Sequence, residues 1–426
     1  MSLLTSLLLL VTVSRLLGRL AKGLGQNEIV GEIFAGLLLG PSILGLVSIT
    51  PELKGVVELG VFLLIFSAGL EIEFHEIVDA IKGKALGSAI VGFLLPLISG
   101  ILLCMQFGFE PLTATVVGLC LAITALPIVV RLLSANNLID SKFGHNVLGA
   151  AVIIDILALL VLGVVFDLKQ EADFLSILKT VGITSAKIIL FFLIVLMVNR
   201  FLRKEITTIE RTRKVIDKMF KFLGEEAVFG IAVLFVLLFS TVTEELGLHF
   251  IIGAFFGGLL LNKDIIGDEF FPPLTRTLDS VSSGFLTPVF FAFIGLQLTT
   301  DAFSNLGFLA AVFAVAFLSK GLGGYVGSRI VGVTHQSSLK MGIFLNARGV
   351  LDLVIADIAF DRGYIGADVF SILVIIGISS TVLSPIAYKI LCKPSQESDS
   401  ESISQEISSG SSETPGTDGS GTPIKS

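Results

Sequence analysis

Asp155 is the residue in this sequence whose position most strongly indicates chemistry. It is the only ionisable side chain in residues 147–166, VLGAAVIIDILALLVLGVVF, and it lies near the middle of that run. A run of this length and character matches the hydrocarbon core of a lipid bilayer. A carboxylate at that depth costs at least about 2.5 kcal/mol on insertion scales, so its default interpretation is a functional site. The structural alternative is an aspartate that is hydrogen-bonded between two helices.

Lys320 is a second charge at membrane depth. It follows the uncharged run 302–319 and is surrounded by glycines, which allow another helix to approach closely. It lies about 13 Å along a helix from Arg329, which is a long way for its ammonium to reach the membrane surface. We therefore expect Lys320 to neutralise either a buried carboxylate or the negative C-terminal ends of nearby helices.

Two further pairs of charged residues are interpreted as structural. Arg348 and Asp352 are four residues apart, so on a continuous helix they would lie on one face and form a pair. Glu32 and Glu71 stand beside glycines in the stretches GEIFAG and AGLEIE. For these two glutamates we expect packing or gating roles, and Glu71 is grouped with Arg348 and Asp352 as a structural charge near the broken helices.

The composition places the chain among polytopic membrane proteins. Hydrophobic residues make up 53% of the 426 residues, charged residues only 15%, and the mean hydropathy is +0.93. These values exclude an ordinary soluble domain. The three cysteines all lie in or beside apolar segments, so the sequence indicates neither disulfides nor a resident metal site. No cofactor and no nucleic-acid partner is expected.

Apolar stretches long enough to span a bilayer predict about thirteen transmembrane helices. They are roughly residues 3–20, 28–47, 56–72, 86–106, 112–134, 143–166, 178–200, 225–243, 248–262, 281–298, 306–327, 339–360 and 366–391. The boundary at 244–247 is the weakest, so twelve helices are the alternative. With the N-terminus outside and the C-terminus in the cytoplasm, most of the 29 lysines and arginines fall on cytoplasmic loops, as the positive-inside rule requires. Residues 394–426, rich in serine and glycine, are expected to form a disordered cytoplasmic tail.

Two pairs of segments indicate an internal repeat. Residues 30–40, VGEIFAGLLLG, are similar to residues 252–262, IGAFFGGLLLN, and residues 62–71, FLLIFSAGLE, are similar to residues 288–297, PVFFAFIGLQ. The partners in each pair are seven helices apart, so they cross the membrane in opposite directions. This is the inverted-topology repeat of many secondary transporters. It divides residues 1–393, the transmembrane unit, into repeat one (1–166), a linker helix (178–200) and repeat two (225–393).

The predicted helices at 112–134 and 339–360 both carry interruptions. Pro127 follows Thr124 in the stretch AITALP, and Asn346 and Gly349 lie in the stretch NARG. Broken helices at corresponding positions of two repeats point to a binding site. The alternative for Pro127 is a simple kink, which is common in membrane helices.

In this order and spacing, the motifs resemble those of the prokaryotic monovalent cation:proton antiporters, in the branch with NapA-type sodium/proton exchangers and Kef-type potassium transporters. The resemblance runs from about residue 8 to residue 393. Its marks are GEIFAGLLLGPSILGL, FSAGLEIE, VIIDILAL, EELGLHFIIGAFFGGLLL, TPVFFAFIGLQL, SKGLGG and NARGVLDLVIA.

The resemblance implies a homodimer in the plasma membrane that exchanges Na⁺ or K⁺ for H⁺ and is not an enzyme. Each protomer would pair a scaffold, roughly predicted helices 1–3 and 8–10, with a moving core, roughly helices 4–6 and 11–13, that holds two crossed broken helices. Asp155 resembles the aspartate that binds cation and proton, Lys320 resembles the core lysine of sodium exchangers, and Thr124 lies in the unwound stretch facing the ion.

The chain departs from the family pattern at one position. Electrogenic members carry two adjacent aspartates in VIDDVLGL, whereas this chain has Ile154 before Asp155. With one carboxylate at this place, we expect electroneutral exchange of Na⁺, or of the similar ion Li⁺, for H⁺. A K⁺/H⁺ antiporter is the near alternative, and a channel or membrane sensor is the distant one. Residues 394–426 are too few for the nucleotide-binding domain of a Kef-type protein, so none is expected.

Overall fold

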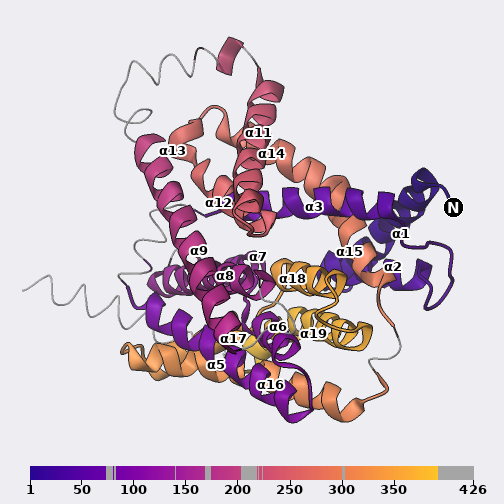
Figure 1. Ribbon diagram of the computed structural model, residues 1–426, viewed down its shortest axis with the longest axis vertical. Coiled ribbons are helices and arrows are strands. Elements are labelled where there is room, and N and C mark those ends of the chain that lie inside the picture. The colour runs from indigo at the N-terminus through magenta and orange to yellow at the C-terminus, as the bar shows by residue number, and fades with distance from the viewer. Residues whose placement is uncertain are drawn as a thin grey trace, which may run out of the picture.

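The protein is entirely helical in the part of the chain that the structure, a computed structural model, describes (Figure 1). This part comprises residues 1–72, 83–139, 141–167, 174–202, 224–299 and 303–391, with Ala80, Lys218 and residues 220–222. The predicted tail at 394–426 lies outside it.

One group of helices combines the N-terminal parts of the first and second predicted repeats. Its members are α1 (Leu3–Gly23), α2 (Glu28–Leu39), α3 (Pro51–Leu70), α11 (Glu225–Glu245), α12 (Phe250–Leu260), α14 (Phe271–Val281), the π-helix η2 (Ser282–Leu286) and α15 (Thr287–Leu296). The four-residue helix α13 (Lys263–Ile266) connects α12 to α14. We call this set the first group, and it occupies the upper part of Figure 1.

A second group contains the remaining helices except one. Its members are α5 (Ala85–Gln106), α6 (Pro111–Ala122), α7 (Leu126–Ala135), α8 (Lys142–Asp167), α16 (Leu306–Ile330), α17 (His335–Leu345), α18 (Val350–Asp361) and α19 (Ala367–Leu391). This second group fills the lower part of Figure 1. The long helix α9 (Phe174–Leu202) contacts α8 in the second group and α12 in the first, so it joins the two.

The helix count differs in detail from the thirteen spanning segments expected. Ten helices in the described residues are long and apolar enough to cross a membrane. The segments expected at 28–47, 248–262 and 339–360 contain only helices of 11 or 12 residues. The chain leaves helical geometry after Leu39 in the first and between α17 and α18 in the third, whereas α12 in the second is simply short.

The similar segments found in the sequence make equivalent contacts in the structure. In α2, a Cβ on Gly36 would lie 1.7 Å from the carbonyl oxygen of Ala292 in α15, and in α12 a Cβ on Gly258 would lie 2.6 Å from that of Phe66 in α3. These glycines occupy matching positions of the two similar segments, as do the two carbonyl residues. The pairs α2–α15 and α3–α12 therefore pack by the same backbone approach, which any side chain would block.

Candidate functional site

Two interrupted helices meet in the second group. Helix α6 ends at Ala122 and α7 begins at Leu126, while α17 ends at Leu345 and α18 begins at Val350. Helices α6, α7 and α17 contact α8, and α18 contacts α6 (Figure 1). Two crossed broken helices, as expected from the sequence, therefore form the centre of this group.

Hydrogen bonds hold the two interruptions against each other. The backbone N–H of Ala125 donates to the carbonyl of Ala347 over 2.9 Å, and the Thr124 hydroxyl donates to the carbonyl of Leu345 over 3.0 Å. Pro127 lies in the first turn of α7, where its missing N–H leaves no helical hydrogen bond unmade. It follows the break and starts the second half-helix, which differs from a kink within one continuous helix.

Arg348 and Asp352 are both buried at the second interruption, but they do not pair with each other. The Arg348 guanidinium donates to the carbonyls of Cys120 (2.9 Å) and Ala316 (3.0 Å), and the Asp352 carboxylate accepts from the N–H of Gly349 (2.9 Å). The predicted i, i+4 pair required a continuous helix, whereas Arg348 precedes the first residue of α18. Arg348 thus binds carbonyl groups across the break, and Asp352 caps the start of α18.

Asn346 completes the second interruption. It is the C-cap residue of α17, and its side-chain amide donates to the carbonyl of Phe317 in α16 over 3.4 Å. Gly349 has no room for a side chain, because a Cβ there would lie 2.6 Å from Cβ of Ala125. Asn346 therefore fixes the end of α17 against α16, and Gly349 permits the close approach of the two interruptions.

Lys320 is fully buried in α16 and donates to the carbonyl of Ala122, the last residue of α6. It has no carboxylate within 4 Å among the described residues, although the charge of Asp155 acts on it from farther away. Of the two roles expected for Lys320, the structure favours the one at a helix C-terminus. There, four carbonyl groups lack helical partners and the helix dipole is negative.

Asp155 lies in α8 beside this crossing and is only 6% exposed. Its Oδ1 atom is buried and has no hydrogen-bond partner. It borders a cavity of 310 Å³ together with Thr124 and Pro127. A buried carboxylate oxygen without a donor is costly unless a proton or cation neutralises the group.

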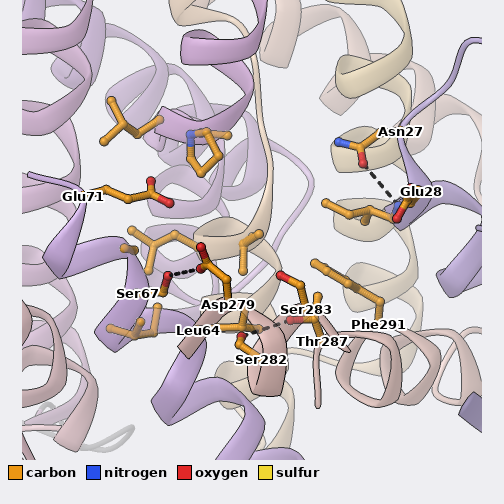
Figure 2. Close-up of a pocket in the computed structure, with 18 of the residues that line it drawn as sticks. Asn27, Glu28, Leu64, Ser67, Glu71, Asp279, Ser282, Ser283, Thr287 and Phe291 are labelled. Carbon is orange, nitrogen blue, oxygen red and sulfur yellow. Dashed lines mark hydrogen bonds between the residues drawn. The ribbon is translucent and has the colours of Figure 1, made fainter. Parts of the chain in front are cut away.

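The opposite wall of this cavity comes from the first group. Figure 2 shows Glu71, Ser67 and Asp279 on one side, with Asn27 and Glu28 on the other. The Ser67 hydroxyl lies 3.3 Å from a carboxylate oxygen of Asp279. The cavity therefore separates the two groups and carries oxygen atoms along both walls.

Glu71 and Asp279 differ from what the sequence indicated. Glu71 is the C-cap residue of α3, so it lies in the cavity wall of the first group and outside the broken-helix crossing. Asp279 was not identified, because the predicted segment began at residue 281, whereas α14, η2 and α15 continue from residue 271 to residue 296. In the sequence, Asp279 was marked only by its place among the polar residues that precede position 281.

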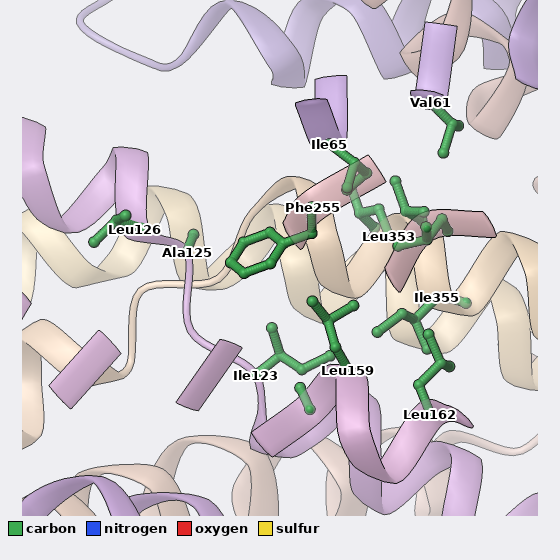
Figure 3. Close-up of a cluster of buried hydrophobic side chains, with 14 of the residues drawn as sticks. Val61, Ile65, Ile123, Ala125, Leu126, Leu159, Leu162, Phe255, Leu353 and Ile355 are labelled. Carbon is green, nitrogen blue, oxygen red and sulfur yellow. The ribbon is translucent and has the colours of Figure 1, made fainter. Parts of the chain in front are cut away.

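An apolar cluster beside the cavity contains side chains from both groups. It contains Val61, Ile65 and Phe255 from the first group and Ile123, Leu159, Leu162, Leu353 and Ile355 from the second (Figure 3). Leu159 lies one helical turn after Asp155 on α8. Asp155 thus lies between the cavity and this apolar cluster, which begins one helical turn farther along α8.

The family of transmembrane sodium/hydrogen exchangers matches residues 7–393. The chain belongs to this family. It is a multi-pass cation/proton antiporter, and so a transporter and not an enzyme, which confirms the resemblance inferred from its motifs.

The antiporter is similar to curated transporters along most of its length. It is 28% identical over 382 residues to the Na⁺/H⁺-K⁺ antiporter GerN of Bacillus cereus, covering 88% of this chain and 93% of GerN. It is 28% identical over 393 residues to the Na⁺/H⁺ antiporter of Enterococcus hirae, covering 91% and 97%. Its fold matches that of the sodium proton antiporter MjNhaP1 of Methanocaldococcus jannaschii with a TM-score of 0.66 at 17% identity, over 91% of this chain and 97% of that one.

Proposed function

We propose that this antiporter exchanges Na⁺ for H⁺ across the plasma membrane and that both bind at Asp155. The observation that carries this proposal is the Asp155 carboxylate, which is buried, lacks a partner at Oδ1 and borders a cavity between two helix groups. Removal from water favours the neutral form of a carboxyl group, so a proton competes with a cation for one site. That competition is sufficient to couple the two fluxes.

Oxygen atoms beside Asp155 supply the rest of the proposed sodium site. Thr124 lies in the break between α6 and α7 and borders the same cavity. Residues in such a break leave carbonyl oxygens outside helical hydrogen bonding, and hard cations prefer oxygen ligands. Lys320 and Arg348 hold neighbouring carbonyls by donating to Ala122 and Cys120, so they serve as supporting charges and not as ligands.

Alternating access follows in this proposal from movement of the second group as the core against the first as the scaffold. Helices within each group contact one another extensively, whereas contacts across the groups are sparse. The matching packing of α2–α15 and α3–α12 supports two inverted repeats, with α9 as their linker. On the predicted topology, the cavity opens to the cytoplasm, because it reaches the start of α2 and the end of α3.

The proposed molecule is a homodimer with its N-terminus outside and its C-terminus in the cytoplasm. The basic residues support this orientation. Large apolar side chains on α1 and α11 are exposed in the single chain, as a surface that faces lipid or a second copy requires. K⁺ is the second candidate cation, because the relative GerN is named as an Na⁺/H⁺-K⁺ antiporter.

Proton flux in proteoliposomes tests the proposal. Acid-loaded vesicles should become alkaline inside when Na⁺ is added outside, and Asp155→Asn should reduce this response to that of empty vesicles. Asp167→Asn, a matched change at the end of the same helix, should retain exchange. Parallel additions of Li⁺ and K⁺ identify the cation. Full activity of Asp155→Asn contradicts the assigned site, and a response to K⁺ alone establishes the second candidate.

A further inference from the structure

We infer that Glu32 forms a second cation-binding site in the cavity, on the scaffold side, which receives Na⁺ from the cytoplasm before Asp155 does. Glu32 lies in α2 and, like Asp155, borders the cavity between the two groups. The inference deepens the proposed function and rests on it for the order of the two sites. The existence of the site itself rests on the geometry of Glu32.

Glu32 is buried but has no partner. Its side chain is 3% exposed, and no hydrogen bond or ion pair within 4 Å joins it to any residue of the described chain. Its Cγ packs near α1, where a Cβ on Gly18 would lie 3.4 Å from it. Glu32 is also one of the residues that line the cavity, so an ion in the cavity can reach this side chain.

Arg15 supplies the positive charge that acts on Glu32, but it does so from a distance, without an ion pair within 4 Å. The guanidinium of Arg15 acts on Glu32 through space but donates its hydrogen bond to the carbonyl of Ser283 in η2. The other charge that acts on Glu32 is the carboxylate of Glu28, which repels it. A buried carboxylate in these surroundings needs a proton or a cation from the cavity for neutralisation.

The placement of Glu32 distinguishes its role from that of Asp155. α2 packs against α1 and α15 in the first group, whereas Asp155 belongs to the second group. Since the proposed movement carries the second group relative to the first, a cation on Glu32 stays with the scaffold and is not itself transported. Glu32 therefore raises the local cation concentration at Asp155 without changing how many ions cross per cycle.

The first test compares transport kinetics of Glu32→Gln and wild type in proteoliposomes. Glu32→Gln should raise the KM for Na⁺ about tenfold and leave the maximal rate nearly unchanged, because it removes binding that is not specific to the rate-limiting step. Glu32→Asp, which keeps the carboxylate, should restore the KM. Glu225→Gln, an exposed change at the start of α11, is the matched control and should behave as wild type. An unchanged KM, or a lower maximal rate with an unchanged KM, overturns the inference.

A second test does not require transport. In the Asp155→Asn variant, dicyclohexylcarbodiimide should modify Glu32, and Na⁺ at constant ionic strength, relative to choline, should protect it. Peptide mass spectrometry reads the modification at Glu32 and at Glu52, an exposed residue of the first turn of α3 whose reaction Na⁺ should not alter. Absence of Na⁺ protection at Glu32 overturns the site. If the wild type shows no proton flux but Na⁺ still protects Glu32, the proposed function is rejected and the Glu32 site stands.

Discussion

At the scale of single residues, two buried cations stabilise the C-terminal end of α6. Lys320 donates to the carbonyl of Ala122, and Arg348 donates to that of Cys120. Helix carbonyls that face a protein interior need such donors, since water does not reach them. The two positive charges therefore maintain the broken-helix crossing next to Asp155.

We predict that Lys320→Gln weakens exchange but does not abolish it. The glutamine amide retains a donor for the Ala122 carbonyl, whereas Lys320→Met leaves that carbonyl without one. Loss of a buried hydrogen bond costs about 1–3 kcal/mol, so Lys320→Met should unfold at a lower temperature than Lys320→Gln. Thermal unfolding in detergent measures this order, with Lys340→Gln as a lysine control outside both interruptions. Complete loss of exchange in a well-folded Lys320→Gln protein would instead indicate a role in the transport cycle.

At the scale of helices, polar contacts join the two groups at the ends of α15 and α18. The Gln297 side chain donates to the Asp357 carboxylate over 2.7 Å, and Lys54 in α3 lies 2.5 Å from Asp361. On the predicted topology these contacts lie on the outer side, beyond the apolar cluster. In the proposed transport cycle, opening of the cavity to that side breaks these contacts.

Cross-linking Lys54→Cys to Asp361→Cys should therefore stop exchange. Both positions are partly exposed, so a short bis-methanethiosulfonate reagent should reach them in a variant without the native cysteines. Addition of a reducing agent should restore proton flux. The matched control is Lys263→Cys with Asp268→Cys, whose charged atoms are 2.9 Å apart within the first group and away from the cavity. Normal exchange by the cross-linked Lys54–Asp361 pair would show that these helices do not separate during transport.

At the scale of the whole molecule, the proposed movement of the second group makes the number of ion-binding carboxylates that it carries decide the stoichiometry. Among the described residues that line the cavity, Asp155 is the only acidic one that the second group contributes. Glu32, Glu71 and Asp279 belong to the first group. One carboxylate that carries either H⁺ or Na⁺ across gives no net charge movement per cycle.

We accordingly predict electroneutral exchange of one H⁺ for one Na⁺. On a supported membrane, a step in Na⁺ concentration should produce no transient current beyond that of Asp155→Asn. Proton flux measured in vesicles of the same preparation confirms that the protein is active. A current that follows the Na⁺ gradient and disappears in Asp155→Asn would show that a second charge crosses with the core.

The sequence by itself determined the membrane class, the two interruptions and the depth of Asp155. These features depend on runs of neighbouring residues, and a carboxylate within an apolar run is expensive wherever the helices pack. Tertiary structure decided which groups each charge meets. Arg348 and Asp352 bind backbone groups and not each other, because Arg348 lies in the break before α18. Lys320 donates to the C-terminal end of α6, which is far from it in the sequence. The cavity wall with Glu32 and Asp279 was likewise decided by packing, because it depends on which helix faces stand opposite α8.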